Sequence, residues 1–155
     1  MLVYRIVHQR YADTLFVSGL GGRWNSNGKK VLYTSESVSL AYLENMAHRR
    51  GFGFNTDFRI MVIEIPSELP FQEVKLSDLP KDWRSFQNYD DCQKIGDAWL
   101  DKAELLYMKV PSAVVMENCN VVINALHPSY GNVKLLDVLD FYPDNRLEEI
   151  IKQFK

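Results

Sequence analysis

SGLGGRWNSNGKKVLYTSESVSLAYLENMAH, Ser18–His48, places a glycine-rich turn, a lone arginine, a short strand and a helix in direct succession. Glycine allows backbone conformations that other residues avoid and lets a ligand approach the main chain closely. Three glycines open the turn: Gly19, Gly21 and Gly22. Arg23 follows at once, and its planar guanidinium suits phosphate or carboxylate. We therefore expect this stretch to organise the fold and to hold part of a binding site.

The second half of this stretch predicts a strand and then a helix that carries a carboxylate. Val31–Thr34 is typical of a strand, and Ser35 is expected to cap the following helix. At about 100° per residue counted from Val38, Leu40, Leu43 and Ala47 fall within one arc, and Ala41 extends it. Glu44 projects into this arc. A buried carboxylate is costly without partners, so Glu44 is either paired, with His48 or an arginine, or held for chemistry.

Length, composition and charge bound the class of protein. The 155 residues fit a single domain, residues 1–155, that can bury a sizeable core. A hydrophobic content of 46% and a charged content of 25% are ordinary for a soluble protein. The net charge of −2 gives no bulk attraction to nucleic acid or to an anionic membrane.

Cysteine usage and hydropathy favour the cytoplasm as the expected compartment. Cys92 and Cys119 lack the spacing of a zinc site, and two cysteines make no disulfide framework. The start of the chain has charges inside its apolar run and does not resemble a signal peptide. No apolar run approaches the roughly 18 residues of a membrane-spanning helix. We expect neither a metal site nor a membrane anchor.

Hydrophobic patterning along the rest of the chain predicts one mixed α/β domain. Strands are expected at Leu2–Val7, Arg59–Ile65, Leu105–Val110, Ala113–Met116, Val121–Ile123 and Val133–Val138. The segment 67–81 is typical of a loop. Helices are expected at Asp91–Leu100, with Gly96 as a weak point, and at Leu147–Phe154. Arg5 lies within the first strand and faces either solvent or a site.

Familiar nucleotide-binding and hydrolase motifs are missing from the sequence. Gly28-Lys29 lacks the Ser or Thr and the earlier glycine of a P-loop, and Trp24 stands where a dinucleotide fingerprint needs its third glycine. No histidine has partners at the spacing of a hydrolase triad. Ser112 lies between two apolar runs, where its hydroxyl bonds either the local backbone or a functional group.

Five blocks of sequence, taken together and in order, resemble the RES domain, a family named for an arginine, a glutamate and a serine. The blocks are GGRWN, LYTSES, LAYLE, GDAWL and VPSAVVMENCNVVINALHP. On this resemblance the arginine of the family falls on Arg23, its tyrosine on Tyr33, its glutamate on Glu44 and its serine on Ser112. Asn124-Ala125 departs from the usual Asn-Pro of the family but removes no reactive group.

The resemblance implies a fold similar to that of ADP-ribosyltransferases, in a bacterial toxin that binds NAD+ and breaks its nicotinamide–ribose bond. Departure of nicotinamide leaves positive charge on the ribose, which Glu44 would stabilise. Arg23, serving substrate charge rather than folding, would hold the pyrophosphate with help from the backbone N–H groups of Gly21 and Gly22. Tyr33 would stack on nicotinamide, and Ser112 would fix the ribose or orient Glu44. We also place Ser35 among the substrate-binding residues.

The family resemblance further implies an Xre-type antitoxin as partner and water or phosphate as acceptor of the ADP-ribosyl group. NAD+ would be a substrate, and no cofactor is expected. A homodimer is compatible with the sequence. Two alternatives remain: a mono-ADP-ribosyltransferase that modifies a protein target, and a non-catalytic domain that binds a nucleotide or a partner.

Overall fold

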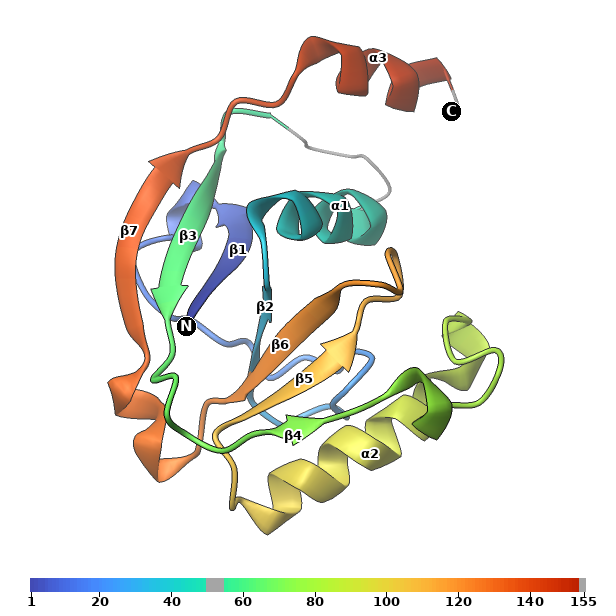
Figure 1. Ribbon diagram of the computed structural model, residues 1–155. Coiled ribbons are helices and arrows are strands. Elements are labelled where there is room, and N and C mark those ends of the chain that lie inside the picture. The colour runs from blue at the N-terminus through green and yellow to red at the C-terminus, as the bar shows by residue number, and fades with distance from the viewer. Residues whose placement is uncertain (50–54, 154–155) are drawn as a thin grey trace.

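The computed structural model describes residues 1–49 and 55–153, which form a seven-stranded mixed sheet with helices (Figure 1). The strand order is β4-β5-β6-β2-β1-β3-β7, and all neighbours are antiparallel except the parallel pair β4–β5. The strands are β1 Leu2–His8, β2 Val31–Ser35, β3 Phe58–Glu64, β4 Gln72–Glu73, β5 Tyr107–Pro111, β6 Cys119–Asn124 and β7 Lys134–Asp140. The expected mixed α/β fold class is confirmed.

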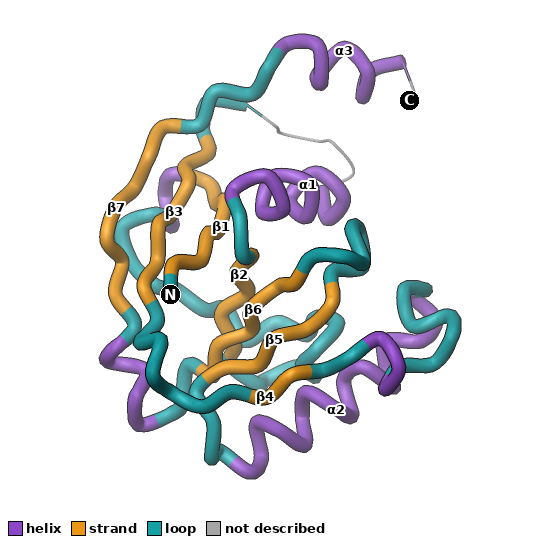
Figure 2. Tube along the Cα trace, in the orientation of Figure 1, coloured by secondary structure: helices purple, strands orange, loops and turns teal. Residues whose placement is uncertain are grey.

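Both long helices pack on the same face of the twisted sheet, one over the half that holds β1 and β3 and the other over the half that holds β5 and β6 (Figures 1 and 2). Helix α1, Val38–Arg49, packs Ala41 against Ile6 of β1. Helix α2, Tyr89–Lys102, packs against the half of this face formed by β2, β5 and β6. Tyr4 of β1 pairs directly with Ser35 of β2, so the alternating side chains of the two strands continue one surface. This face therefore has one helix over each half.

The opposite face carries the largest buried cluster. Its members come from strands and connecting segments: Val3, Leu32, Met61, Ile63, Ile65, Leu106, Tyr107, Val121, Ile123 and Val133. Arg5 lies on this side, because it alternates with the flanking residues of β1 that face α1. Its guanidinium donates to the carbonyl of Phe16 at 3.0 Å, and burial lowers its pKa. Arg5 therefore supports the loop over this face and lies away from Glu44.

Helix α1 differs from the sequence prediction in its cap and in its buried arc. The helix begins at Val38, and the hydroxyl of Ser37, not Ser35, accepts the N–H of Leu40 at 3.1 Å. The cap is displaced because β2 extends through Ser35. Leu40 and Ala41 are buried as expected, but two other members of the expected arc, Leu43 and Ala47, are exposed.

Helix α2 is longer than the predicted helix and buries Cys92 and Trp99. The weak point assigned to Gly96 is instead a packing requirement. A Cβ at this position would lie 1.8 Å from the carbonyl oxygen of Trp24, so only glycine lets α2 approach the glycine-rich turn so closely. Gln93 of α2 strengthens this contact by donating to the carbonyl of Gly22 at 2.8 Å.

Three further segments differ from the elements predicted from the sequence. The strand expected at Ala113–Met116 is wrong, because this segment turns from β5 to β6. The loop expected at 67–81 contains the short edge strand β4. Helix α3, Asn145–Gln153, replaces the predicted Leu147–Phe154, whose last residue lies outside the described residues. No helix of the described ranges is long and apolar enough to cross a membrane.

Candidate functional site

Glu44 is held at the end of the sheet by two neutral donors. The hydroxyl of Ser112 donates to Glu44 Oε1 at 2.7 Å, and the amide of Asn120 donates to the same oxygen at 2.5 Å. Ser35 in turn donates to Asn120 Oδ1 at 2.7 Å. We call Ser35, Glu44, Ser112 and Asn120 the carboxylate group. It joins α1 to β2, to β6 and to the residue that follows β5.

Ser112 is fully buried, and the turn after β5 fixes its direction. Its oxygen accepts the N–H groups of Val114 at 3.0 Å and Val115 at 2.9 Å. A hydroxyl has one proton to donate, and here that proton goes to Glu44. Ser112 therefore bonds the local backbone and also donates to Glu44, and its role in the reaction stays a prediction.

The second carboxylate oxygen, Oε2 of Glu44, has no hydrogen bond within the part of the chain that the structure describes. Neither His48 nor an arginine is paired with Glu44 there. The side chain is only partly buried. A partly exposed carboxylate with one oxygen fixed and the other available can face a developing positive charge.

Arg23 is anchored by main-chain carbonyls and aromatic rings. Its two terminal nitrogens donate to the carbonyls of Trp83 and Arg84, the second at 2.9 Å. Its guanidinium carbon lies 4.4 Å from the ring centroid of Tyr89. Among the described residues no acidic side chain forms an ion pair with Arg23. Arg23 is therefore a structural anchor that keeps an uncompensated positive charge.

Tyr33 is bound through its hydroxyl to the glycine-rich turn. The oxygen accepts the N–H of Trp24 at 3.0 Å and donates to Asn25 Oδ1 at 2.6 Å. Burial raises the pKa of the phenol. A Cβ on Gly22 would lie 2.7 Å from this hydroxyl, so glycine is needed for the close approach. The hydroxyl is thus fully used within the protein.

The backbone amides of the turn also form hydrogen bonds within the protein, so their expected role in holding a pyrophosphate stays a prediction that requires these bonds to be exchanged. The N–H of Gly21 donates to Asn27 Oδ1 at 2.8 Å, and the N–H of Gly22 donates to the carbonyl of Asn25 at 2.9 Å. An N–H group already bonded in this way is not free for a phosphate oxygen. We call Gly21, Gly22, Arg23 and Tyr33 the turn group.

The two groups lie on the same face of the sheet. Tyr33 and Ser35 are two positions apart on β2, so their side chains point the same way, about 7 Å apart along the strand. A second connection comes from Arg84, whose Nε donates to the carbonyl of Ala113, next to Ser112, at 2.7 Å. The structure therefore brings the predicted site residues together as two adjoining groups.

Two residues of this region, Asn120 and Arg84, were not predicted from the sequence. Asn120 stands opposite Ser35 in the β2–β6 pair, and it is a polar residue beside an apolar run, Val121–Ile123. That break in pattern is the signal that could have identified it. Arg84 lies in a loop and forms no ion pair within the described chain. Nothing in its local pattern points to the site.

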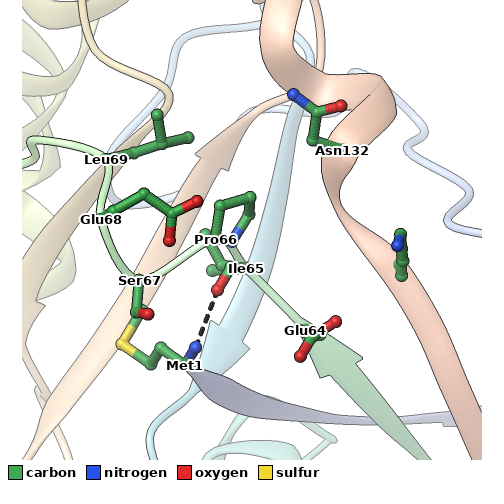
Figure 3. Close-up of a pocket in the computed structure, with 9 residues that line it drawn as sticks. Met1, Glu64, Ile65, Pro66, Ser67, Glu68, Leu69 and Asn132 are labelled. Atoms are coloured by element: carbon green, nitrogen blue, oxygen red, sulfur yellow. Dashed lines mark hydrogen bonds between the residues drawn. The ribbon is translucent and has the colours of Figure 1, made fainter.

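A separate cavity of about 410 Å³ lies where β1 begins and β3 ends (Figure 3). It is lined by Met1, Glu64, Ile65, Pro66, Ser67, Glu68, Leu69, Asn132 and Lys134. The terminal ammonium of Met1 donates to the carbonyl of Ile65 at 2.8 Å. No residue of the carboxylate group or of the turn group lines this cavity. Among the described residues, no three His, Cys, Asp or Glu side chains gather as a metal site.

Comparison with known proteins gives relatives over nearly the whole chain. Toxin Res of Photorhabdus laumondii is 31% identical over 153 residues, which are 95% of this chain and 97% of that protein. The Prs ADP-ribosylating toxin of Sphingobium sp. is 31% identical over 141 residues, 88% of each chain.

A solved structure and a family profile agree with these relatives. The fold is shared with a crystal structure of the MbcT–MbcA toxin–antitoxin complex of M. tuberculosis, with a TM-score of 0.72 and 16% identity, over 98% of this chain and 88% of that one. The sequence profile of the RES domain matches residues 2–144. The chain therefore belongs to the RES domain family of toxins.

Proposed function

We propose that this toxin consumes NAD+ by breaking the bond between nicotinamide and ribose, with water or phosphate as acceptor. The observation that carries the proposal is the geometry of Glu44, whose Oε1 is fixed by Ser112 and Asn120 while Oε2 has no partner in the described chain. An oriented carboxylate of this kind favours a cationic transition state over the neutral ground state of the sugar.

In the proposed reaction the bond between ribose C1′ and the pyridinium nitrogen breaks, and its electron pair leaves with nicotinamide. The ribose then carries positive charge, which Oε2 of Glu44 faces. Water attacks C1′ and loses a proton to give ADP-ribose, or phosphate attacks to give the 1-phosphate ester of the same ribose. Glu44 also binds a ribose hydroxyl before the bond breaks.

The pyrophosphate of NAD+ would lie against two arginines of the site. Arg23 and Arg84 carry charges that no acidic side chain neutralises in the described chain. Arg23 is fixed by the carbonyls of Trp83 and Arg84, so its charge is held in place before substrate arrives. A preorganised guanidinium binds phosphate oxygens at lower entropic cost than a mobile one. The partly exposed ring of Tyr33 would stack on nicotinamide.

The test is incubation of purified protein with NAD+, with and without phosphate, followed by identification of the products. We expect free nicotinamide together with ADP-ribose or its phosphate ester, and no change of rate on addition of a chelator. Intact NAD+ after prolonged incubation with folded protein would contradict the proposal.

Transfer of ADP-ribose to a protein is the second candidate, because one relative over most of the chain carries the name Prs ADP-ribosylating toxin. The same carboxylate would serve, and a side chain of the target would replace water. The two reactions are separated by the acceptor. NAD+ consumption in the absence of any other protein favours hydrolysis or phosphorolysis, whereas consumption only with a protein that gains mass favours transfer.

We further propose that an Xre-type antitoxin binds this chain and blocks the site. The proposal is supported by the shared fold with a toxin solved together with its antitoxin. Expression of the chain alone should arrest growth, and co-expression with a neighbouring Xre-type protein should restore it. Sedimentation of the isolated chain would show whether it forms the proposed homodimer. A non-catalytic binding domain would arrest no growth and release no nicotinamide.

A further inference from the structure

Asn120 connects Glu44 to the sheet through a chain of hydrogen bonds that runs in one direction. A carboxylate accepts only, so the NH2 of Asn120 must face Glu44 Oε1, where it lies at 2.5 Å. The carbonyl oxygen of Asn120 then faces Ser35, which must donate to it, at 2.7 Å. Because the Glu44 carboxylate can only accept, the order of donation is fixed. Ser35 donates to Asn120, and Asn120 donates to Glu44.

We propose that Asn120 is a positioning residue for the reaction and that Ser35 acts through it by fixing the orientation of its amide. The inference rests on the proposed function of Glu44. Ser35 thus has a role different from the helix cap and from the substrate contact expected from sequence.

Positioning matters here because a glutamate side chain has three rotatable torsions. Ser112 and Asn120 reach the same oxygen of Glu44 from two different strand ends, the first after β5 and the second at the start of β6. One hydrogen bond would leave the carboxylate free to rotate about it. Two donors on Oε1 fix the plane of the carboxylate and hence the direction of Oε2.

The experiment measures kcat and KM for nicotinamide release in Asn120→Ala, Ser35→Ala and the double variant. Loss of a hydrogen bond to a charged group should lower kcat by roughly tenfold or more in Asn120→Ala, with KM changed by less than about twofold. Ser35→Ala should lower kcat by about threefold. In the double variant the effect of Ser35→Ala should disappear, because the path from Ser35 through Asn120 to Glu44 is already removed.

Two further variants separate positioning from packing. Asn120→Asp keeps the size of the side chain and still accepts from Ser35, but it places a second carboxylate beside Glu44. Positioning predicts a kcat at least as low as that of Asn120→Ala, whereas packing predicts a milder loss.

Thr34→Val is the matched control. Thr34 is buried on β2 next to Ser35 and donates to the carbonyl of Val121 at 2.8 Å, on the other face. The Thr34→Val variant should have a lower melting temperature and an unchanged kcat.

A wild-type kcat in Asn120→Ala, or an undiminished effect of Ser35→Ala in the double variant, would overturn the inference. Failure of the proposed function looks different, because wild-type protein would then release no nicotinamide. In that event NMR of protein labelled with 13C at the glutamate carboxyl still decides the matter. The Glu44 side chain should become less ordered in Asn120→Ala, and unchanged order would overturn the positioning role.

Discussion

The carboxylate group and the turn group share one face of the sheet, but they satisfy their polar atoms in different ways. In the turn group, Arg23 and the hydroxyl of Tyr33 are bound by carbonyls, an amide and aromatic rings of the protein itself. In the carboxylate group, Glu44 keeps one oxygen without a partner in the described chain. A site residue whose polar atoms are all satisfied mainly stabilises the fold, whereas one with an unused atom can bind or react. Changes in the turn group should therefore reduce stability more than turnover. Changes in the carboxylate group should reduce turnover more than stability.

The largest effect on turnover is expected for Glu44→Gln. The glutamine carbonyl can accept from both Ser112 and Asn120, so the melting temperature should hardly move. The charge that faces the developing cation is lost, which should lower the rate by about 10²–10³, or roughly 3–4 kcal/mol. Nicotinamide release and thermal unfolding measured on the same sample test this.

Glu36→Gln is the matched control for this variant. Glu36 also accepts from a neighbouring asparagine, Asn118 at 2.9 Å, and from the N–H of Cys119 at 3.0 Å, but its side chain is exposed. The turnover of the Glu36→Gln protein should be unchanged. Near-normal turnover in a destabilised Glu44→Gln protein would show that Glu44 is a structural partner and that the two groups do not differ as argued.

Ser112→Ala should come next, with a loss of turnover of about tenfold or more. It removes one donor from Glu44 and also the acceptor of the N–H groups of Val114 and Val115. Because these amides lose a partner, the free energy of unfolding should fall by roughly 1–3 kcal/mol. Kinetics at a temperature well below the unfolding transition separate the two effects. A loss of stability with unchanged kcat would leave Ser112 with the backbone role alone.

Arg23→Lys should affect stability and substrate affinity together. The ammonium of lysine cannot reproduce the planar guanidinium that bonds the carbonyls of Trp83 and Arg84. The free energy of unfolding should therefore fall by about 1–2 kcal/mol. KM for NAD+ should rise only a few-fold, since the charge remains. Arg146→Lys is the control, because Arg146 is highly exposed and bonds only Asp144 among the described residues. A raised KM without any loss of stability would make Arg23 a substrate ligand and not an anchor.

The sequence predicted most of the strands and the face to which Glu44 belongs, because both follow from local periodicity. The cap of α1 was misplaced since either of two serines fits the start of a helix, and only the length of β2 decides between them. The segment Ala113–Met116 is apolar like a strand, but the hydroxyl of Ser112 bonds its amides and turns it. In this segment two hydrogen bonds to one side chain outweigh the local pattern.

Most contacts within the site could not be predicted because they join residues far apart in the chain. The resemblance to the RES domain pointed to Arg23, Tyr33, Glu44 and Ser112 and offered the contact of Ser112 with Glu44 as one alternative. It gave neither Asn120 nor the carbonyls that Arg23 bonds. Whether Arg23 meets a phosphate or a carbonyl depends on where the loop of Trp83 folds, and that loop has no periodic pattern. Likewise Asn120 reaches Glu44 only because β6 pairs with β2.

Tyr33→Phe should have the smallest effect on turnover and gives the sharpest test of the turn group. The variant keeps the ring that is proposed to stack on nicotinamide but removes the hydroxyl that accepts from Trp24 and donates to Asn25. Asn25 is fully buried, so its oxygen would lose a partner without gaining water. The free energy of unfolding should fall by about 1–3 kcal/mol.

Turnover of the folded Tyr33→Phe protein should stay within about twofold of wild type, because a hydroxyl used wholly within the turn takes no part in bond cleavage. Tyr130→Phe is a suitable control. Its hydroxyl donates to the carbonyl of Leu15 at 3.1 Å on the opposite face of the sheet, so it should lower stability without any route to the site. If Tyr33→Phe instead lowers kcat by tenfold or more at unchanged stability, the phenol acts on substrate. The turn group would then share in the chemistry that we assign to the carboxylate group alone.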